Sequence, residues 1–238
     1  MRPEPLSILP ATRDPAQQAA AVAHLRVADP VLARLIARIG PPTIRHEPDY
    51  FAALVGTIVG QQISVRAAAS VRARLAACFQ PAPLTPAGVL ALGEPGLRAC
   101  GLSQAKARYV LDLAARVHGG QLDLAALDAL DDEAVIQRLT VVKGIGRWSA
   151  EMLLIFGLGR PDVLPVDDLG FRAAVRREYG LETLPRAAVL RALAEPWRPW
   201  RTFATWYLWR SAAQDPTIAV PPASDGTARI RDGAPRSS

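Results

Sequence analysis

Two adjacent aspartates, Asp167 and Asp168, follow Pro165 in the segment PVDDLGFR. A fixed carboxylate can stabilise a positive charge that develops during a reaction, or it can orient an attacking water. An aspartate after a proline is also typical of a helix N-cap, where the side chain accepts a backbone N–H and performs no chemistry. The segment by itself leaves a catalytic and a structural interpretation open.

A pair of glycines, Gly144 and Gly146, precedes a helix-like run upstream of the two acids. Glycines let a backbone approach a phosphate closely, and the N–H groups that begin the next helix can bind an anion. A dinucleotide-binding loop would need a third glycine and a preceding strand. Ser149 stands at that third position and a helical run comes first, so the pattern predicts two helices joined by a tight hairpin. A plain turn stays the alternative to a phosphate site.

The elements that must position these residues have helical periodicity. Residues 49–62 place their large apolar side chains on one face of a helix, namely Phe51, Leu54, Val55, Ile58 and Val59. Helix N-caps are predicted ahead of later apolar runs, at Ser64, Thr85, Ser103 and Asp131. Further helices are predicted near 147–157, 167–178, 186–195 and 199–213. No alternating strand pattern or βαβ unit is found, so the predicted fold class is all-α.

The predicted organisation has two helical lobes between two tails. Residues 1–14 are predicted to be a flexible N-terminus, and residues 215–238 a disordered tail rich in Pro, Gly, Ser and charge. One lobe is predicted over 15–120, with a contribution from the N-terminal helices. The second, over 121–214, carries the hairpin and the aspartates.

Composition narrows the function classes. The chain has 238 residues, half of them hydrophobic, and a net charge of +6, which favours a polyanionic partner. No apolar run reaches the roughly 20 residues of a membrane span, and the first residues lack the apolar segment of a signal peptide. We therefore expect a cytoplasmic protein with no membrane partner. Two cysteines cannot supply the four thiolates of an iron–sulfur cluster.

Several motifs together resemble the helix-hairpin-helix (HhH-GPD) DNA glycosylases, and among them the alkylation-repair branch, DNA-3-methyladenine glycosylase II. They are LTVVKGIGRWSAEMLL followed by PVDDLGFR, IVGQQISVRAA at 58–68, LSQAKARYVLDLA at 102–114 and RPWRTFATWYLWR at 198–210. The resemblance covers roughly residues 45–213. It implies two helical lobes with a cleft between them, without the β-rich N-terminal domain of a larger relative. It also implies a monomer that binds double-stranded DNA in the nucleoid, flips a damaged base and excises it.

The resemblance assigns roles by position. Asp168 matches the catalytic aspartate, 168 − 148 = 20 residues after Trp148. The base pocket is assigned to Trp148, Trp209 and Met152. DNA contacts are assigned to Gly144, Gly146, Arg147, Lys143 and Gln62, with Gln62 at the position of a wedge side chain. Backbone carbonyls that hold a monovalent cation, Na⁺ or K⁺, are assigned to Thr140, Val142 and Ile145. For Arg147, pairing with an acid is an equal alternative to a phosphate contact.

This chain departs from some relatives at informative positions. In the bifunctional branch, the position of Trp148 is a lysine that forms a Schiff base, and tryptophan has no nucleophilic amine. The sequence therefore predicts a monofunctional enzyme that leaves an abasic site and needs no cofactor for catalysis. Lys143 replaces the usual hairpin proline, and Met152 replaces an aromatic residue of a bacterial relative.

Two other functions stay open at this stage. One is a glycosylase for deaminated or other damaged bases, such as uracil or hypoxanthine. The other is a non-catalytic helix-hairpin-helix module that only binds DNA. An acid at the 20-residue spacing argues against the binding module, and the absence of the lysine argues against the oxidised-base branch.

Overall fold

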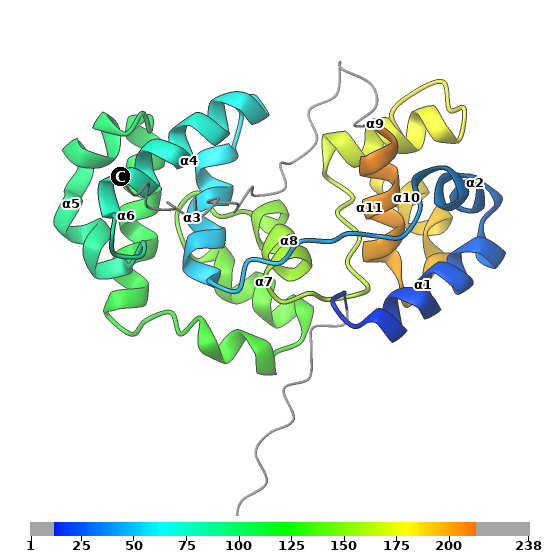
Figure 1. Cartoon of the computed structure of the whole chain (residues 1–238), viewed down its shortest axis with the longest axis horizontal. Helices are drawn as coiled ribbons and strands as arrows, with labels where there is room; N and C mark the ends of the chain where they lie inside the picture. Colours follow the sequence, from blue (N-terminus) through cyan, green and yellow to red (C-terminus); the bar gives the residue numbers. More distant parts are fainter. Residues whose placement is uncertain (1–11, 213–238) are drawn as a thin grey trace, which may run out of the picture.

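The computed structural model describes residues 12–212, and all regular elements in this range are helical (Figure 1). The α-helices are α1 (Pro15–Ala28), α2 (Pro30–Ile39), α3 (Tyr50–Gly60), α4 (Val65–Phe79), α5 (Pro86–Ala99), α6 (Gln104–His118), α7 (Asp132–Thr140), α8 (Arg147–Phe156), α9 (Leu169–Glu178), α10 (Ala187–Leu193) and α11 (Arg201–Ala212). The all-α prediction is confirmed. No helix in this range is both long and apolar enough to cross a membrane. The predicted tail at 215–238 and most of the 1–14 segment lie outside the described residues.

The helices form two lobes, but not with the predicted membership. Helices α3 to α8 pack together, whereas α1 and α2 pack with α9 and α11 (Figure 1). The chain crosses between the lobes twice, from α2 to α3 and from α8 to α9. The boundaries predicted at 15–120 and 121–214 therefore need correction, since α1 and α2 join the later helices while α7 and α8 join the earlier ones. An amphipathic period shows that a helix has an apolar face, but it does not identify the helix that covers it.

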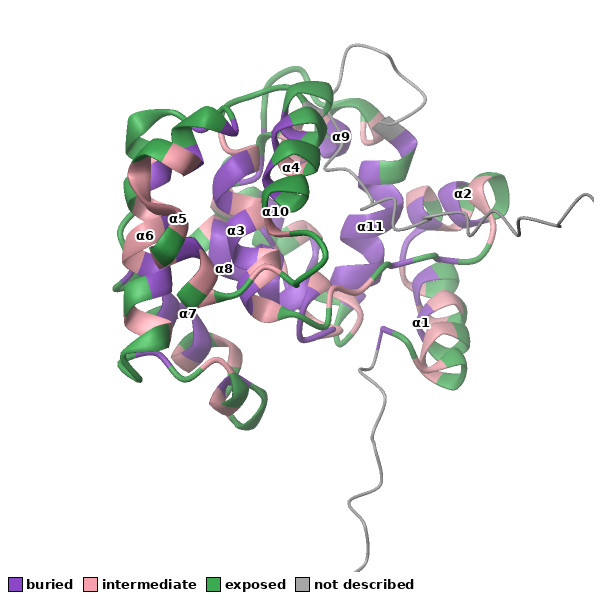
Figure 2. Cartoon of the chain, turned by 60° about the vertical axis from the view of Figure 1, so that its left-hand side comes forward, coloured by how far each residue is buried: buried purple, intermediate pink, exposed green. Residues whose placement is uncertain are grey.

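Helix α8 lies inside the first lobe, against α3 and α7. All residues from Ser149 to Ile155 are buried, which explains the predominantly buried ribbon of α8 in Figure 2. Its N-terminus follows the hairpin, and the segment after its C-terminus leads to Asp168. The two predicted functional segments are therefore attached to opposite ends of one buried helix.

Helix α11 is the centre of the second lobe, with every residue from Thr202 to Trp209 buried. Asp29 caps α2 and also accepts hydrogen bonds from the Tyr179 hydroxyl (2.7 Å) and from Nε1 of Trp197 (2.9 Å). Charged acceptors make such bonds strong, so this buried carboxylate ties α2 to the elements around α11. These bonds link α2 to the end of α9 and to the segment that precedes α11.

Candidate active site

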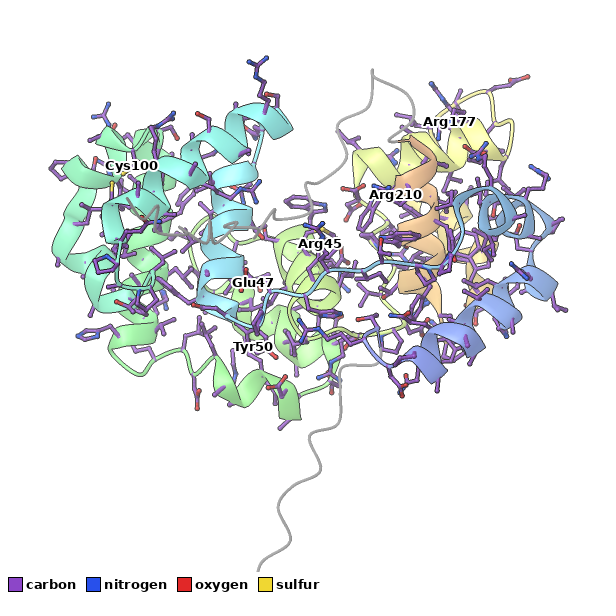
Figure 3. All side chains as sticks on the ribbon, viewed as in Figure 1. Arg45, Glu47, Tyr50, Cys100, Arg177 and Arg210 are labelled. Atoms are coloured by element: carbon purple, nitrogen blue, oxygen red, sulfur yellow. The ribbon has the colours of Figure 1, made fainter. Side chains whose placement is uncertain are left out.

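A cavity of about 720 Å³ is lined by residues of both lobes. Helices α3, α8 and α11, the start of α9 and the segment 43–47 contribute to its walls. Figure 3 labels Arg45 and Glu47 on the segment that crosses between the lobes, and Arg210 on α11, all of which line the cavity. A cavity of this size, built from a few polar groups on apolar walls, is typical of a ligand site.

Asp168 lines this cavity, although it is only 8% exposed. It is the N-cap of α9, where its Oδ1 accepts the backbone N–H of Phe171 at 2.6 Å. The same Oδ1 accepts Nε1 of Trp209 at 2.9 Å, and Oδ2 accepts Nε1 of Trp148 at 2.8 Å. Three N–H donors therefore hold the carboxyl group of Asp168 at the start of α9. Asp168 is thus both the N-cap and the pocket carboxylate, whereas its neighbour Asp167 is exposed.

Two aromatic residues of the site, Trp148 and Phe156, share one face of α8 with Met152. Trp148, Met152 and Phe156 follow each other at i, i+4 and i+8, and all three line the cavity. Trp209 of α11 stacks on Phe156, with ring centroids 5.9 Å apart and 21° between the planes. The structure therefore brings the three predicted pocket residues together with Asp168. Sequence reasoning missed Phe156, although the i+4 spacing from Met152 could have indicated it.

The hairpin between α7 and α8 depends on one of its two glycines. Gly144 has φ +81°, and a Cβ at this position would collide with the ring of Tyr109. Gly146 has extended backbone angles and no heavy atom near the position of a Cβ. Gly146 caps α8 without a side-chain hydrogen bond, so the first N–H groups of the helix have no capping side chain. The two glycines therefore serve different purposes, tight packing at Gly144 and open access at Gly146.

The loop after α3 is hydrogen-bonded to this hairpin. Nε2 of Gln61 donates to the carbonyl of Gly144 at 2.8 Å and to Oγ of Ser149 at 3.2 Å. Nζ of Lys106 donates to the carbonyls of Val59 (2.8 Å) and Gln61 (2.6 Å). Gln62 was predicted from the sequence, but the roles of Gln61 and Lys106 in holding the loop were not. A polar side chain beside a helix end has no distinctive sequence pattern.

Gln62 itself is held in an unusual backbone conformation. It is exposed, lines the cavity and has φ +56°, a left-handed angle that residues other than glycine adopt at a cost. Ile63 beside it is 39% exposed. The loop therefore presents one polar and one apolar side chain at the cavity.

Arg147 is paired with acids in this structure. Its guanidinium donates two hydrogen bonds to Glu133, at 2.7 and 2.8 Å, and lies 3.4 Å from Glu151. Burial raises the pKa of Glu151 to about 7, Arg147 opposes this rise, and the Asp167 carboxylate adds to it. Lys143 is exposed, and its backbone N–H donates to Asp112 at 3.0 Å. Of the two interpretations of Arg147, the structure contains the acid pair.

The predicted cation ligands are all backbone carbonyls of the hairpin. Thr140 ends α7, where a helix leaves its last carbonyls without intrahelical partners. The carbonyl of Val142 accepts the N–H of Ile145 at 3.1 Å and retains its second lone pair. Carbonyl oxygens of this kind suit a hard monovalent cation. Among the described residues, no group of three His, Cys, Asp or Glu side chains could hold a metal ion.

Comparisons with known proteins find related sequences. A family model described as "HhH-GPD superfamily base excision DNA repair protein" matches residues 55–199. DNA-3-methyladenine glycosylase 1 of Schizosaccharomyces pombe is 32% identical over 183 residues, which cover 76% of this chain and 80% of that relative. A Bacillus subtilis relative is 35% identical over 126 residues, 53% of this chain, but the match spans only 44% of that relative.

A solved structure extends the similarity to three dimensions. The S. pombe 3-methyladenine DNA glycosylase in complex with abasic DNA superposes with a TM-score of 0.74 at 32% identity. The match covers 82% of this chain and 97% of that chain. The similarity therefore includes both lobes.

Proposed function

The chain belongs to the HhH-GPD superfamily of base excision DNA repair proteins, and we propose that it is a monofunctional DNA glycosylase for alkylated bases. It would remove bases of the 3-methyladenine and 7-methylguanine class from double-stranded DNA and leave an abasic site. The observation that carries this proposal is the buried carboxylate of Asp168, held by two indole N–H groups at an aromatic cavity. The relatives named for this activity support the substrate class.

The carboxylate suits the chemistry of glycosidic bond cleavage. A base must leave the DNA stack before its bond to the sugar can be attacked. As that bond breaks, the sugar becomes an oxocarbenium-like cation, which a fixed carboxylate stabilises. Asp168 can do this without rearrangement, because its three N–H donors already hold it at the cavity. It could equally orient the attacking water.

The cavity supports excision without strand cleavage. A lyase reaction needs an amine that attacks the sugar, and Trp148 supplies none. No lysine lines the cavity within the described part of the chain. The amine of Lys106 is engaged by two carbonyls near the end of α3. These features favour hydrolysis by water over a Schiff base.

The aromatic walls suit a flipped base. The indole edges of Trp148 and Trp209 are turned to Asp168. Trp209 is buried and stacks on Phe156, so the half-buried ring of Trp148 offers the face for contact with the base. Aromatic faces attract cationic bases by about 0.5–2 kcal/mol. Met152 adds a polarisable side chain that adapts to irregular shapes. This wall accounts for binding of bulky alkylated purines.

The hairpin would hold the DNA backbone. The open N–H groups at Gly146 and the start of α8 suit a phosphate, and Lys143 adds a positive charge nearby. The carbonyls of Thr140, Val142 and Ile145 would hold a Na⁺ or K⁺ ion that screens the same phosphate. Gln62 would fill the gap that the flipped base leaves. Arg147 would contact DNA only after it exchanges Glu133 for a phosphate. We expect the protein to act as a monomer.

The experiment uses end-labelled duplex DNA treated with a methylating agent. The protein should produce breaks at methylated purines only after hot alkali, and none on untreated DNA. Retarded DNA on a binding gel without such breaks would contradict the proposal and favour a binding module.

A further inference from the structure

The guanidinium of Arg72 lines the cavity without a hydrogen-bond or ion-pair partner among the described residues. Arg72 of α4 lines the cavity, and its Nη1 lies 3.7 Å from the position that a Cβ would take on Gly56 of α3. It is half-buried, yet it makes no hydrogen bond or ion pair within the described part of the chain. Arg147 and Arg201, by contrast, are both bonded to carboxylates. Within the described range, Arg72 is therefore a cation on the cavity wall that no protein acceptor pairs.

An unpaired guanidinium in such a place is costly. Loss of hydration lowers the pKa of Arg72, because burial disfavours its charged form. Its planar fork carries five N–H donors and no acceptor, so only an acceptor or an anion can satisfy it. The fork matches a bidentate pair of acceptors, as in the contact of arginine with O6 and N7 of a purine. A ligand that offers such an edge would recover what burial costs.

The wall around Arg72 leaves room for a base. The face of α3 in the cavity carries only small side chains, at Ala52, Ala53, Gly56, Thr57 and Gly60. Arg45 and Arg210 also line the cavity, against the two acids Glu47 and Asp168. Three arginines and two acids make the lining formally positive. Positive charge near the base repels a cationic purine and does not repel an uncharged one.

The departing base also gains from a positive charge at its edge when it leaves as an anion. Hydrolysis breaks the bond between the base and C1′, and both bonding electrons go to the base. Water then adds its hydroxyl to C1′, and its proton goes to solvent when the base was cationic, or to the departing base when the base was uncharged. A cationic alkylated purine departs as a neutral molecule, whereas an uncharged base departs with negative charge. A guanidinium at the base edge stabilises that charge and therefore accelerates release of uncharged bases most.

We propose that Arg72 is a specificity-determining residue, which raises the excision of uncharged bases that present hydrogen-bond acceptors relative to the excision of cationic alkylated ones. This inference rests on the proposed glycosylase function and extends its substrate class. Hypoxanthine is a suitable probe, since it is uncharged and retains O6 and N7. 7-Methylguanine is its counterpart, because methylation blocks N7 and makes the nucleoside cationic.

The test measures single-turnover excision of both bases from otherwise identical duplexes. Arg72→Met should lower the ratio of the hypoxanthine rate to the 7-methylguanine rate about tenfold or more, in line with the value of a bidentate pair. Arg72→Lys should give a ratio between those of wild type and Arg72→Met, because lysine keeps the positive charge but lacks the two parallel donors of the guanidinium. Arg191→Met, which removes an exposed charge on α10, should leave the ratio unchanged. Thermal unfolding of each variant verifies that it is folded.

A parallel titration uses duplex DNA with an abasic-site analogue, which has no base to recognise. Arg72→Met should bind it as tightly as wild type. Weaker binding, with both excision rates reduced in parallel, would make Arg72 a phosphate contact and overturn the proposal. Wild type that excises 7-methylguanine but not hypoxanthine would also overturn it. Wild type inactive on every damaged base would instead refute the proposed glycosylase function itself.

Discussion

Nε1 of Trp148 donates a hydrogen bond to Oδ2 of Asp168 over 2.8 Å, although the two residues are 20 positions apart. Trp148 lies in the first turn of α8 and Asp168 caps α9. The bond therefore spans the segment that crosses between the lobes. The 20-residue spacing between the two motifs allows this bond, and the bond holds the carboxylate of Asp168 at the cavity.

Removal of the indole N–H should impair catalysis more than binding. Trp148→Phe keeps an aromatic ring but leaves Oδ2 of Asp168 without this donor. Hydrogen bonds to charged groups contribute about 1.5–3 kcal/mol, so we expect the single-turnover rate to fall roughly 10- to 100-fold. Affinity for abasic DNA should change little. Trp200→Phe is the matched control, since Trp200 packs on Phe203 and does not line the cavity. Equal losses in the two variants would contradict the assignment.

The two hairpin glycines should respond differently to alanine. Gly144→Ala places a Cβ against Tyr109 at a positive φ, and we expect it to lower the free energy of unfolding by about 1–3 kcal/mol. Gly146→Ala should leave stability within about 0.5 kcal/mol, because its backbone is extended and its surroundings are open. It should nevertheless weaken DNA binding, since the Cβ obstructs approach to a phosphate. Urea unfolding and a binding titration measure both effects. A stable Gly144→Ala variant would refute the packing account.

Glu151 should make stability depend on pH. Its folded pKa is raised from 4.5 to about 7 by burial. Below pH 4.5 the carboxyl is protonated in the folded and in the unfolded protein. Between pH 4.5 and 7 it ionises in the unfolded chain but retains its proton in the folded protein. Stability should therefore fall across this window, by roughly 1–3 kcal/mol. Glu151→Gln should lack this fall.

Glu133→Gln is the control for this experiment. The pKa of Glu133 is lowered by its hydrogen bond from Arg147, so its contribution has the opposite sign. This variant should keep the fall in stability between pH 4.5 and 7. Urea unfolding at several pH values separates the two residues. An unchanged pH profile for Glu151→Gln would show that Glu151 is not the buried acid responsible.

The absence of a lysine at position 148 predicts no covalent intermediate. Borohydride traps the Schiff base of a lyase, and this protein should give no trapped complex with DNA that contains an alkylated base or an abasic site. Labelled strands should stay intact until alkali is added. A protein–DNA band that survives denaturing electrophoresis after borohydride would contradict the monofunctional proposal.

Local features of the fold could be predicted from the sequence because they depend on neighbouring residues. The N-caps expected at Ser64, Thr85, Ser103 and Asp131 all accept backbone N–H groups in the structure. The packing of α1 and α2 against α11 could not be predicted, since periodicity does not identify partners. Helix α5 also contains a kink at Gly93, with φ +66°, that periodicity did not show.

The candidate site also has some features that could be predicted from the sequence and others that could not. Trp148, Met152, Trp209 and Asp168 could be identified because their motifs and spacing lie within the resemblance, and the structure places them together. The hydrogen bonds from Trp148 and Trp209 to Asp168 could not be predicted, because they join residues of different helices. Arg72 had no signal at all, because an arginine on a helix rich in alanine resembles any solvated one. What distinguishes it is its position against α3, with no hydrogen-bond or ion-pair partner among residues 12–212.

The catalytic role of Asp168 can be measured as the single-turnover rate of Asp168→Asn on a duplex that contains 7-methylguanine. Asparagine caps helices about as well as aspartate, so α9 and the fold should persist while the negative charge is lost. Asp167→Asn, which alters the exposed neighbour, is the matched control. We predict a rate about 100-fold or more below wild type for Asp168→Asn and a near wild-type rate for Asp167→Asn. Full excision activity in Asp168→Asn would contradict the account.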